Sequence, residues 1–379
     1  MKKKDILELK RRMTKNNCTI TRICGCVVDT GKNIVTMFEK PFLNLDDEEY
    51  FKYLDIAKGV MKGKLKDNLL NLKIEEDQKE NGGMQQCLLA LRDSGLNSSR
   101  VQQGFYDHII ENYDYPGEYL ILLFHDAYDV MMKTSDNNKL DESEEVYEYL
   151  ICAICPINLA APGLAYSEEE KDITNRIRDK IVDAPTVGFI YPAFTDRSED
   201  RDTMLVYEKD AKNPHKDLVA SLGCVPEETA TEQRETLKEI ITKAIGDVDE
   251  SDVKVYEDFH RILDEKLEEE AKKELERAEQ QKLTIGILAK TLETAGADKT
   301  EIEAIEKEYR NGFDKTPDIA AVVDEKAVKA SVARDPVEMM KKMLADAAKE
   351  IETLAGGETE LSLKIRGMSK PDNSGSPNP

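Results

Sequence analysis

Residues Tyr113 to Leu159, YDYPGEYLILLFHDAYDVMMKTSDNNKLDESEEVYEYLICAICPINL, contain the two most apolar runs of the sequence, Tyr119–Phe124 and Tyr149–Ile157. Apolar runs this short, bounded by turn residues, are typical of buried strands. Between them lie Ser135–Asn138 and Asp141–Ser143, whose composition predicts a loop. We therefore expect an antiparallel strand pair at the centre of a sheet. The segments before the pair would form one wall of the core, and the segments after it the other.

Strand-like and helical segments alternate on both sides of this pair. Two short apolar runs, Ile20–Val28 and Ile34–Phe38, flank a turn and predict a β-hairpin. Helical spacing or capping residues predict helices over 5–15, 44–63, 84–92, 98–112 and 168–181, and further strands are expected over 65–74, 186–194 and 203–207. Because these elements interleave without strict βαβ alternation, the predicted fold class is α+β. Residues 1–225 would form this domain, mainly an antiparallel sheet flanked by helices.

The composition changes after Pro226, where the chain becomes acidic and rich in helix-forming residues. We expect residues 226–366 to form a largely helical region. It would contain a long helix over about 255–283 and a helical hairpin over 284–311, followed by extended or mixed structure over 317–332, a helix over 336–354 and a strand over 359–365. The long helix carries only a narrow apolar stripe, so it would be largely exposed or pack against a partner. The polar, proline-containing tail 367–379 is expected to be disordered.

The charge of the chain is unevenly distributed. A formal net charge of −23 argues against indiscriminate binding to nucleic acid or to anionic membranes. Residues 1–22, however, contain eight Lys or Arg and only two Asp or Glu, with Lys10, Arg11 and Arg12 in one run. Such a basic arm either contacts phosphate or docks on the acidic surface of its own protein, and the second alternative is the more common one.

The sequence also indicates where the protein resides. It contains no run of about 18 apolar residues, which a transmembrane helix would need. Its charged start is not followed by the apolar segment of a signal peptide, so a cytoplasmic location is expected. Seven cysteines, an odd number in a large chain, fit free thiols in a reducing compartment.

Two cysteine groups resemble metal or redox motifs. Cys24 and Cys26 would share one face of a strand and could converge with Cys18, but a closed zinc site needs further ligands, which the sequence does not supply nearby. We therefore interpret these residues as small buried hydrophobes and expect no metal site. Cys152 and Cys155 have C-x-x-C spacing, yet within a strand residues three apart point to opposite faces. Their sulfurs should diverge.

The cluster from His125 to Asp129 has the clearest chemical potential. His125, Asp126 and Asp129 could bind a hard cation or act as an acid and a base. In a strand, however, His125 and Asp129 share one face and Asp126 the other, so the three cannot all converge. A polar bend at a strand edge needs the same residue types. Arg197, in the polar loop after Phe194, could hold an anion, or could pair with the carboxylates of its own loop.

Several common motifs are absent from the sequence. It has no P-loop, G-x-G-x-x-G, G-x-S-x-G or H-E-x-x-H sequence, and we expect no cofactor. The hairpin 284–311 could be mistaken for a DNA-binding helix-turn-helix. Its second helix is too acidic to lie in a major groove, so packing or protein contact is the expected role.

Four blocks carry a resemblance to a known family. They are ELKRRMTKNNCTITRICGCVVD, FLNLDDEEYFKYLDIAKGVMKG, the block from Glu111 to Leu159, and GFIYPAFTDRSEDRD. Together they resemble the clostridial family of domain of unknown function 4317, which has no assigned activity, and the resemblance weakens after about Asp314. The order of an N-terminal hairpin, a helix pair and a central strand pair is also similar to the layout of bacterial nucleoid-associated proteins, at the level of fold only.

Three functional hypotheses follow. The first is a non-enzymatic binding or scaffolding protein that contacts a protein partner, or a second copy of itself, through its C-terminal helices. The second is a nucleoid-associated protein that binds nucleic acid through Lys10, Arg11 and Arg12. The third is a metal-dependent enzyme built around His125, Asp126 and Asp129.

Overall fold

The computed structural model describes residues 1–80, 82–133, 139–168, 171–175, 178–246, 249–273 and 280–334. The helix expected over 336–354, the strand expected over 359–365 and the tail 367–379 lie outside the described residues.

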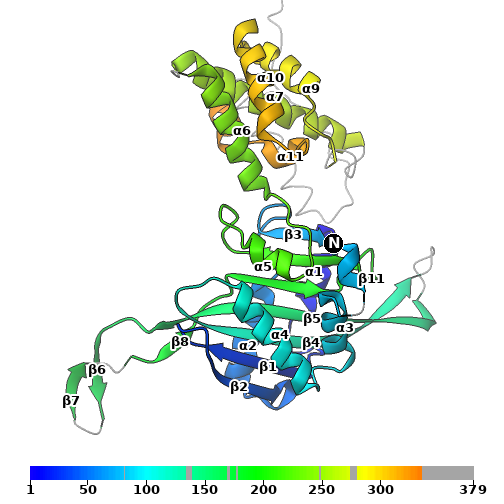
Figure 1. The fold of residues 1–379 in the computed structure, drawn as a ribbon, viewed down its shortest axis with the longest axis vertical. Helices are drawn as coiled ribbons and strands as arrows, with labels where there is room; N and C mark the ends of the chain where they lie inside the picture. Colours follow the sequence, from blue (N-terminus) through cyan, green and yellow to red (C-terminus); the bar gives the residue numbers. More distant parts are fainter. Residues whose placement is uncertain are drawn as a thin grey trace, which may run out of the picture.

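An eight-stranded antiparallel sheet is the centre of the first part of the chain (Figure 1). Its strands, in sheet order, are β2 (Ile34–Pro41), β1 (Arg22–Val28), β4 (Glu118–Lys133), β5 (Lys139–Leu159), β9 (Val187–Tyr191), β12 (Thr203–Glu208) and β3 (Leu69–Lys73), with β8 (Lys180–Val182) paired to β5. Two small two-stranded sheets accompany it, formed by β6 (Leu164–Ser167) with β7 (Asp172–Asn175) and by β10 (Ala193–Thr195) with β11 (Ser198–Asp200). The predicted fold class, an antiparallel α+β arrangement followed by a helical region, is confirmed.

The expected central strand pair is present as β4 and β5. Tyr119 pairs with Pro156 and Phe124 with Ile151, so the two apolar runs are antiparallel neighbours. Both strands are longer than expected, and Asp141–Ser143, predicted to be loop, belongs to β5. The other predicted loop residues, Ser135–Asn138, lie outside the described residues. From Asp126 of β4 and Tyr149 of β5 toward the loop that joins the two strands, their described residues pair with each other and with no third strand. The added length is thus held by backbone pairing and needs no apolar pattern.

Helices cover both faces of the sheet. The first wall consists of α3 (Met84–Asp93), α4 (Ser99–Asn112) and α5 (Lys216–Ser221), and the second of α1 (Lys3–Arg12) and α2 (Asp47–Gly59). Ile121 and Leu123 face the first wall, whereas Leu120 and Leu122 face the second. Burial on both faces explains why β4 reads as a continuous apolar run. We expected the segments before the strand pair to form one wall and the segments after it to form the other. This is wrong, because α1 to α4 all precede the strand pair and yet contribute to both walls.

The helix expected over 168–181 is not formed. The described residues of this segment form β7 and β8, and β6 lies just before it. Ile181 pairs with Asn158 of β5, and Ile173 pairs with Tyr166. Cross-strand pairing therefore overrides the helical propensity of the many charged residues in this segment.

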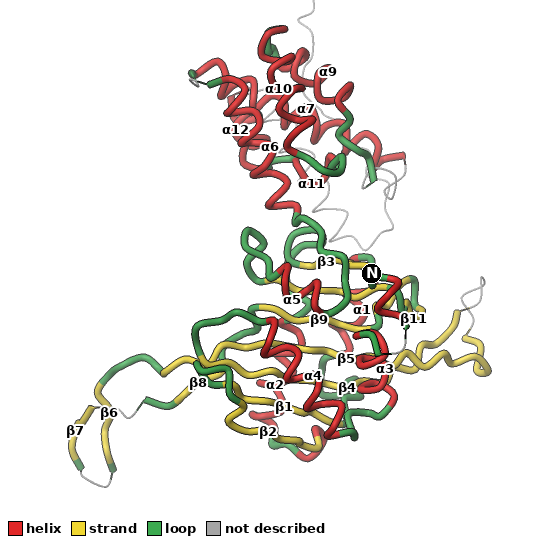
Figure 2. Tube along the Cα trace, viewed as in Figure 1, coloured by secondary structure: helices red, strands yellow, loops and turns green. Residues whose placement is uncertain are grey.

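The rest of the described chain is helical (Figure 2). It contains α6 (Ala230–Ile245), α7 (Glu250–Lys273), α9 (Ile285–Ala295), α10 (Lys299–Gly312), α11 (Ile319–Val322) and α12 (Glu325–Arg334). The hairpin expected over 284–311 is present as α9 and α10. The long helix ends earlier than predicted, because residues 280–283 are not helical, and 317–332 is largely helical. Within the described chain, no helix combines the length and apolarity that crossing a membrane requires.

The apolar stripe of α7 is covered by other helices of the same region. Phe259 and Leu263 are fully buried in a hydrophobic cluster that also contains side chains of α6, α9, α10, α11 and α12. Of the two alternatives expected for this stripe, exposure is therefore wrong for these two residues, and they pack against helices of the same chain.

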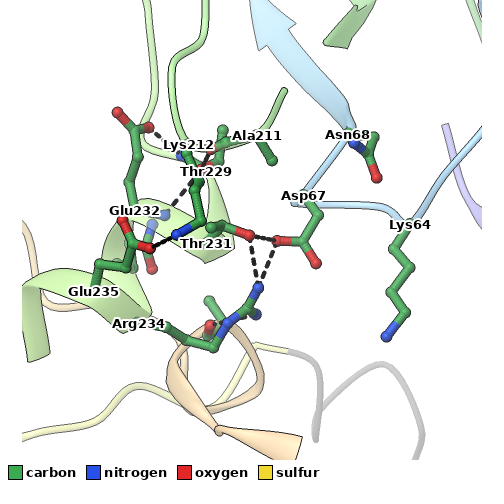
Figure 3. A network of polar contacts seen from close by, with 12 residues as sticks. Lys64, Asp67, Asn68, Ala211, Lys212, Thr229, Thr231, Glu232, Arg234 and Glu235 are labelled. Atoms are coloured by element: carbon green, nitrogen blue, oxygen red, sulfur yellow. Dashed lines mark hydrogen bonds and ion pairs between the residues drawn. The ribbon is translucent and has the colours of Figure 1, made fainter. Parts of the chain in front are cut away.

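A polar network joins the helical region to the sheet (Figure 3). Asp67, in the loop before β3, accepts hydrogen bonds from Thr231 Oγ1 and from Arg234 Nη2, both over 2.8 Å. Arg234 also donates to the carbonyl oxygen of Ala321 over 3.2 Å. One guanidinium thus contacts the loop of the sheet, α6 and α11. The domain boundary near residue 225 stays a prediction.

Candidate functional site

His125 and Asp126 lie on opposite faces of the sheet. The carboxyl group of Asp126 is buried and accepts hydrogen bonds from the hydroxyls of Thr19 and Tyr149. His125 lies on the other face, near Gly95, where burial lowers the pKa of its ring. The described residues include no hydrogen-bond partner for its Nε2 atom. The side chain of Asp129 lies outside the described residues. The structure therefore does not bring His125 and Asp126 together.

Asp126 belongs to a network that includes the basic N-terminal helix. Arg12 Nη2 donates to Thr19 Oγ1 over 2.7 Å, and Thr19 in turn donates to Asp126. The Arg12 guanidinium also lies over the ring of Tyr128, with its carbon 3.7 Å from the ring centroid. Such a stacked cation is attracted by the negative face of the ring. Because burial raises the pKa of Tyr149 well above its ordinary value, its hydroxyl remains protonated and donates to Asp126.

Arg197 lies at the tip of a tight turn between β10 and β11, within the segment expected to be loop. Asp196 and Arg197 both have positive φ values, 49° and 66°. Two such residues between paired strands form the kind of turn that usually contains Asn and Gly, and each non-glycine residue in this region costs roughly 1 kcal/mol. Arg197 Nη2 lies 3.4 Å from Glu8 Oε1, and Glu8 also accepts a hydrogen bond from Tyr128.

Ion pairs connect the turn to the start of α1. Asp196 lies 2.9 Å from Lys4 Nζ and 3.3 Å from Lys2 Nζ, and hydrogen bonding to these two ammonium groups lowers the pKa of Asp196. The basic helix is thus docked on carboxylates of its own protein. Docking on its own protein is the second of the two alternatives that the sequence left open for the basic arm. Some cations of the arm nevertheless remain available.

A cationic groove lies between α1 and the β10–β11 turn. It has a volume of about 580 Å³ and is lined by Lys4, Glu8, Arg11, Arg12, Asn17 and Arg197. Four of these side chains are cationic and one is acidic. The sequence suggested one role for Arg11 and Arg12 and a separate role for Arg197. The structure places all three in one groove. We call it the α1 groove.

Three residues that the sequence suggested, Arg11, Arg12 and Arg197, line the α1 groove. Lys10, grouped with Arg11 and Arg12 in the sequence, does not line the groove. It is partly buried elsewhere, and this burial, together with Lys62, lowers its pKa. Lys4 and Asn17 were missed. For Lys4 the signal was present, because positions 4, 8, 11 and 12 share one face of a helix.

A second, acidic hollow borders the α1 groove. It has a volume of about 870 Å³ and is lined by Val146, Tyr147 and residues 195–202. Those residues include four carboxylates, Asp196, Glu199, Asp200 and Asp202, and two arginines, Arg197 and Arg201. Arg197 therefore stands between a cationic and an acidic surface. A ligand in the α1 groove would meet repulsion if it extended past the turn.

The cysteines occupy positions that separate their sulfurs. Cys152 packs in the core on the α3–α4 side of the sheet and Cys155 on the α1–α2 side, as predicted for a strand. Cys24 and Cys26 share the first side, whereas Cys18 packs against the second. All seven cysteines are free thiols, and within the described ranges no three His, Cys, Asp or Glu side chains form a group suited to a metal ion.

Comparison with known proteins identifies one family. A family model described as "Domain of unknown function (DUF4317)" matches residues 1–358, and so extends well beyond Asp314, where the sequence resemblance was expected to weaken. Neither the curated proteins nor the solved structures contain a match to the chain.

Proposed function

This chain belongs to the DUF4317 family, and we propose that it is a non-enzymatic binding protein that holds a phosphate-bearing polyanion in the α1 groove. The observation that carries this proposal is the convergence of Lys4, Arg11, Arg12 and Arg197 in one groove, where Glu8 pairs with Arg197 and Asp196 of the adjoining turn pairs with Lys4. The two elements that supply them are far apart in sequence, so local composition alone does not account for the cluster. The cytoplasmic location stays a prediction.

Arginine is well suited to this role. Its planar guanidinium presents several N–H donors that match two oxygens of one phosphate, and it retains its charge at any physiological pH. Arg11 is exposed, and within the described part of the chain no ion pair or hydrogen bond engages its side chain. Arg12 is fixed by Thr19 and Tyr128, so its orientation is set before a ligand arrives. The groove therefore combines an oriented arginine with an available one.

The net charge of the protein limits the kind of polyanion. Charges separated by more than a Debye length, about 8 Å at physiological salt, are largely screened, so a phosphate in the groove responds mainly to the nearby cations. A long duplex would also approach the acidic hollow beyond Arg197 and be repelled. We therefore propose a short single-stranded nucleic acid segment as the ligand, bound weakly and with strong dependence on salt.

The experiment measures binding of a fluorescently labelled single-stranded oligonucleotide to the full chain by anisotropy at several salt concentrations. We expect Arg11→Ala to weaken binding several-fold and to reduce the slope of log K against log salt by about 0.7. The matched control is Arg100→Ala, which removes an exposed arginine from α4 on the other side of the sheet. Absence of binding at low salt, or equal effects of the two substitutions, would overturn the proposal.

The other hypotheses have less support. The separation of His125 and Asp126 removes the geometric basis for an acid and base pair at that position, and no observation favours a particular scaffold partner for the C-terminal helices. The likeness to nucleoid-associated proteins stays a prediction.

A further inference from the structure

A fully buried carboxylate lies where the sheet meets the helical region. Glu208, the last residue of β12, is 0% exposed. Its two oxygens contact His215, the residue before α5: Oε1 accepts the backbone N–H over 3.0 Å, and Oε2 lies 2.8 Å from Nδ1. A buried charge without a partner is costly, so buried carboxylates are paired as a rule. Among the described residues, the His215 ring is the one group that forms an ion pair with Glu208, and it does so only when protonated.

The protonation state of His215 therefore decides whether this carboxylate is compensated. The titratable groups that face the ring are Glu208, Asp210 in the loop after β12, and Tyr113 after α4, whose ring centroid lies 5.2 Å away. The two carboxylates favour the charged form of the ring, whereas burial raises the pKa of Tyr113 and keeps that side chain neutral. The hydrogen bond to Glu208 raises the pKa of His215 above its ordinary value of 6.5, although burial opposes this shift. The stabilisation is thus complete below about pH 6.5 and is lost as the pH rises through the pKa of the folded protein.

The pair closes a loop that holds the start of α6. Residues 209–214 connect Glu208 to His215, and the carbonyl oxygen of Ala211 accepts a hydrogen bond from Thr229 Oγ1 over 2.5 Å (Figure 3). Thr229 is the N-cap residue of α6 and is fully buried. Two ion pairs add to this contact, Lys212 with Glu235 and Lys216 with Glu232. The pair between Glu208 and His215 thus joins the two ends of the segment on which the N-terminus of α6 rests.

We propose that His215 and Glu208 form a pH-sensitive latch for the attachment of the helical region. When His215 is protonated, the ion pair holds the loop 209–214 closed and keeps Ala211 in place for Thr229. When His215 loses its proton, the buried carboxylate loses its counter-charge, and the loop opens more readily to admit water to Glu208. The Asp67–Arg234 pair contains no histidine and still joins the loop before β3 to α6, so the attachment loosens without being released. This proposal is independent of the α1 groove.

The test is hydrogen exchange of the full chain, measured by mass spectrometry in steps from pH 6 to pH 9 and corrected for the intrinsic pH dependence of exchange. We expect protection in peptides that cover 209–216 and the first turn of α6 to fall several-fold as the pH rises. Peptides from α10, which makes no contact with the loop among the hydrogen bonds and ion pairs described, serve as the internal reference. The midpoint of the change should coincide with the titration of the His215 ring, followed by NMR.

Two substitutions separate the charge from the hydrogen bond. His215→Gln retains an N–H donor without a charge, so protection of the loop should be low at every pH. Glu208→Gln removes the buried charge, so a neutral His215 is no longer unfavourable and protection should stay high at every pH. The matched control is His108→Gln, because the His108 ring lies 2.8 Å from the carbonyl oxygen of Ser221 and not beside a carboxylate. This variant should keep the pH dependence of the wild type.

Three results would overturn the proposal. They are equal protection of the wild-type loop at pH 6 and pH 9, the same decline with pH in Glu208→Gln as in the wild type, and titration of the His215 ring below pH 6.5. Circular dichroism checks that each variant is folded. If His215→Gln does not fold, the comparison of Glu208→Gln with the wild type still decides the question.

Discussion

Asp67 and Arg234 form an ion pair, 2.8 Å between Oδ1 and Nη2, that connects the loop before β3 to α6. Their side chains are only 15% and 28% exposed, in the same order. The same carboxylate oxygen accepts from Thr231, and the same guanidinium reaches the backbone of α11 (Figure 3). The attachment of the helical region to the sheet thus includes a partly desolvated charge pair. Lys64 and Glu325 provide a second, much more exposed link, 2.6 Å between Nζ and Oε1.

These two pairs should differ in their contribution to stability. Removal of one partner from a largely buried pair leaves the other charge without compensation and costs several kcal/mol, whereas exposed pairs contribute about 0 to 1 kcal/mol. We therefore expect Asp67→Ala to destabilise the attachment by about 2 to 4 kcal/mol, and Lys64→Ala by less than about 1 kcal/mol. Urea unfolding, with hydrogen exchange in α6 as the local readout, measures both. Equal losses for the two variants would show that burial does not govern this attachment.

Two neighbouring tyrosines allow a test of the Asp126 network. Tyr149 donates its hydroxyl hydrogen to the Asp126 carboxyl group, and Tyr147 donates its own to the backbone carbonyl of Pro192, each over 2.6 Å. Removing the hydrogen-bond donor of a buried carboxyl group costs more stability than removing the donor of a neutral carbonyl group. We expect Tyr149→Phe to cost about 2 to 3 kcal/mol and Tyr147→Phe about 1 kcal/mol, both measured by denaturant unfolding. A larger loss for Tyr147→Phe would contradict this assignment.

The sequence predicts those parts of the fold whose signal is local. The runs Tyr119–Phe124 and Tyr149–Ile157 are apolar on both sides because both faces of the sheet are covered, and their antiparallel pairing is confirmed. The alternation within a strand likewise places Cys152 and Cys155 on opposite faces. The segment 168–181 contains no comparable signal. Its charged residues favour a helix locally, and only pairing with Tyr166 and with the end of β5 makes it strand.

The α1 groove could be predicted only in part. The helical spacing of Lys4, Glu8 and Arg12 indicates one basic face of a helix, but nothing near Arg197 in the sequence indicates that a turn formed much later in the chain lies against that face. The position of Arg197 follows from the docking of the β10–β11 turn on α1. Asp196 of the turn pairs with α1, and Glu8 of α1 pairs with the turn. Such long-range placement depends on the whole fold and leaves no local pattern.

The thiols should be poorly reactive in the native protein. Burial raises the pKa of Cys24, Cys26, Cys155 and Cys224 to about 12, so the reactive thiolate is scarce at neutral pH. Only Cys18 and Cys87 are partly exposed.

We therefore expect iodoacetamide at pH 8 to modify these two first, and all seven cysteines only after unfolding, as read by mass spectrometry of peptides. Rapid native alkylation at Cys155, or a Cys152–Cys155 disulfide recovered from folded protein, would contradict the strand geometry.

His260 should make the helical region sensitive to acid. Its ring is buried between Tyr256 and Phe259, its Nδ1 accepts the N–H of Asp324 over 3.2 Å, and burial lowers its pKa from 6.5 to about 4. Because the unfolded chain takes up this proton first as pH falls, stability is lost between about pH 6.5 and pH 4, and the loss reaches about 2 kcal/mol at pH 5.

In His260→Gln the amide oxygen can still accept the N–H but does not titrate. The difference in unfolding free energy between wild type and His260→Gln should therefore shift by about 2 kcal/mol in favour of the variant from pH 7.5 to pH 5, whatever its value at pH 7.5. Phe259→Leu, a substitution at the neighbouring buried position, should show no such shift, and a pH-independent difference for His260→Gln would mean that the buried imidazole is not kept neutral by the fold.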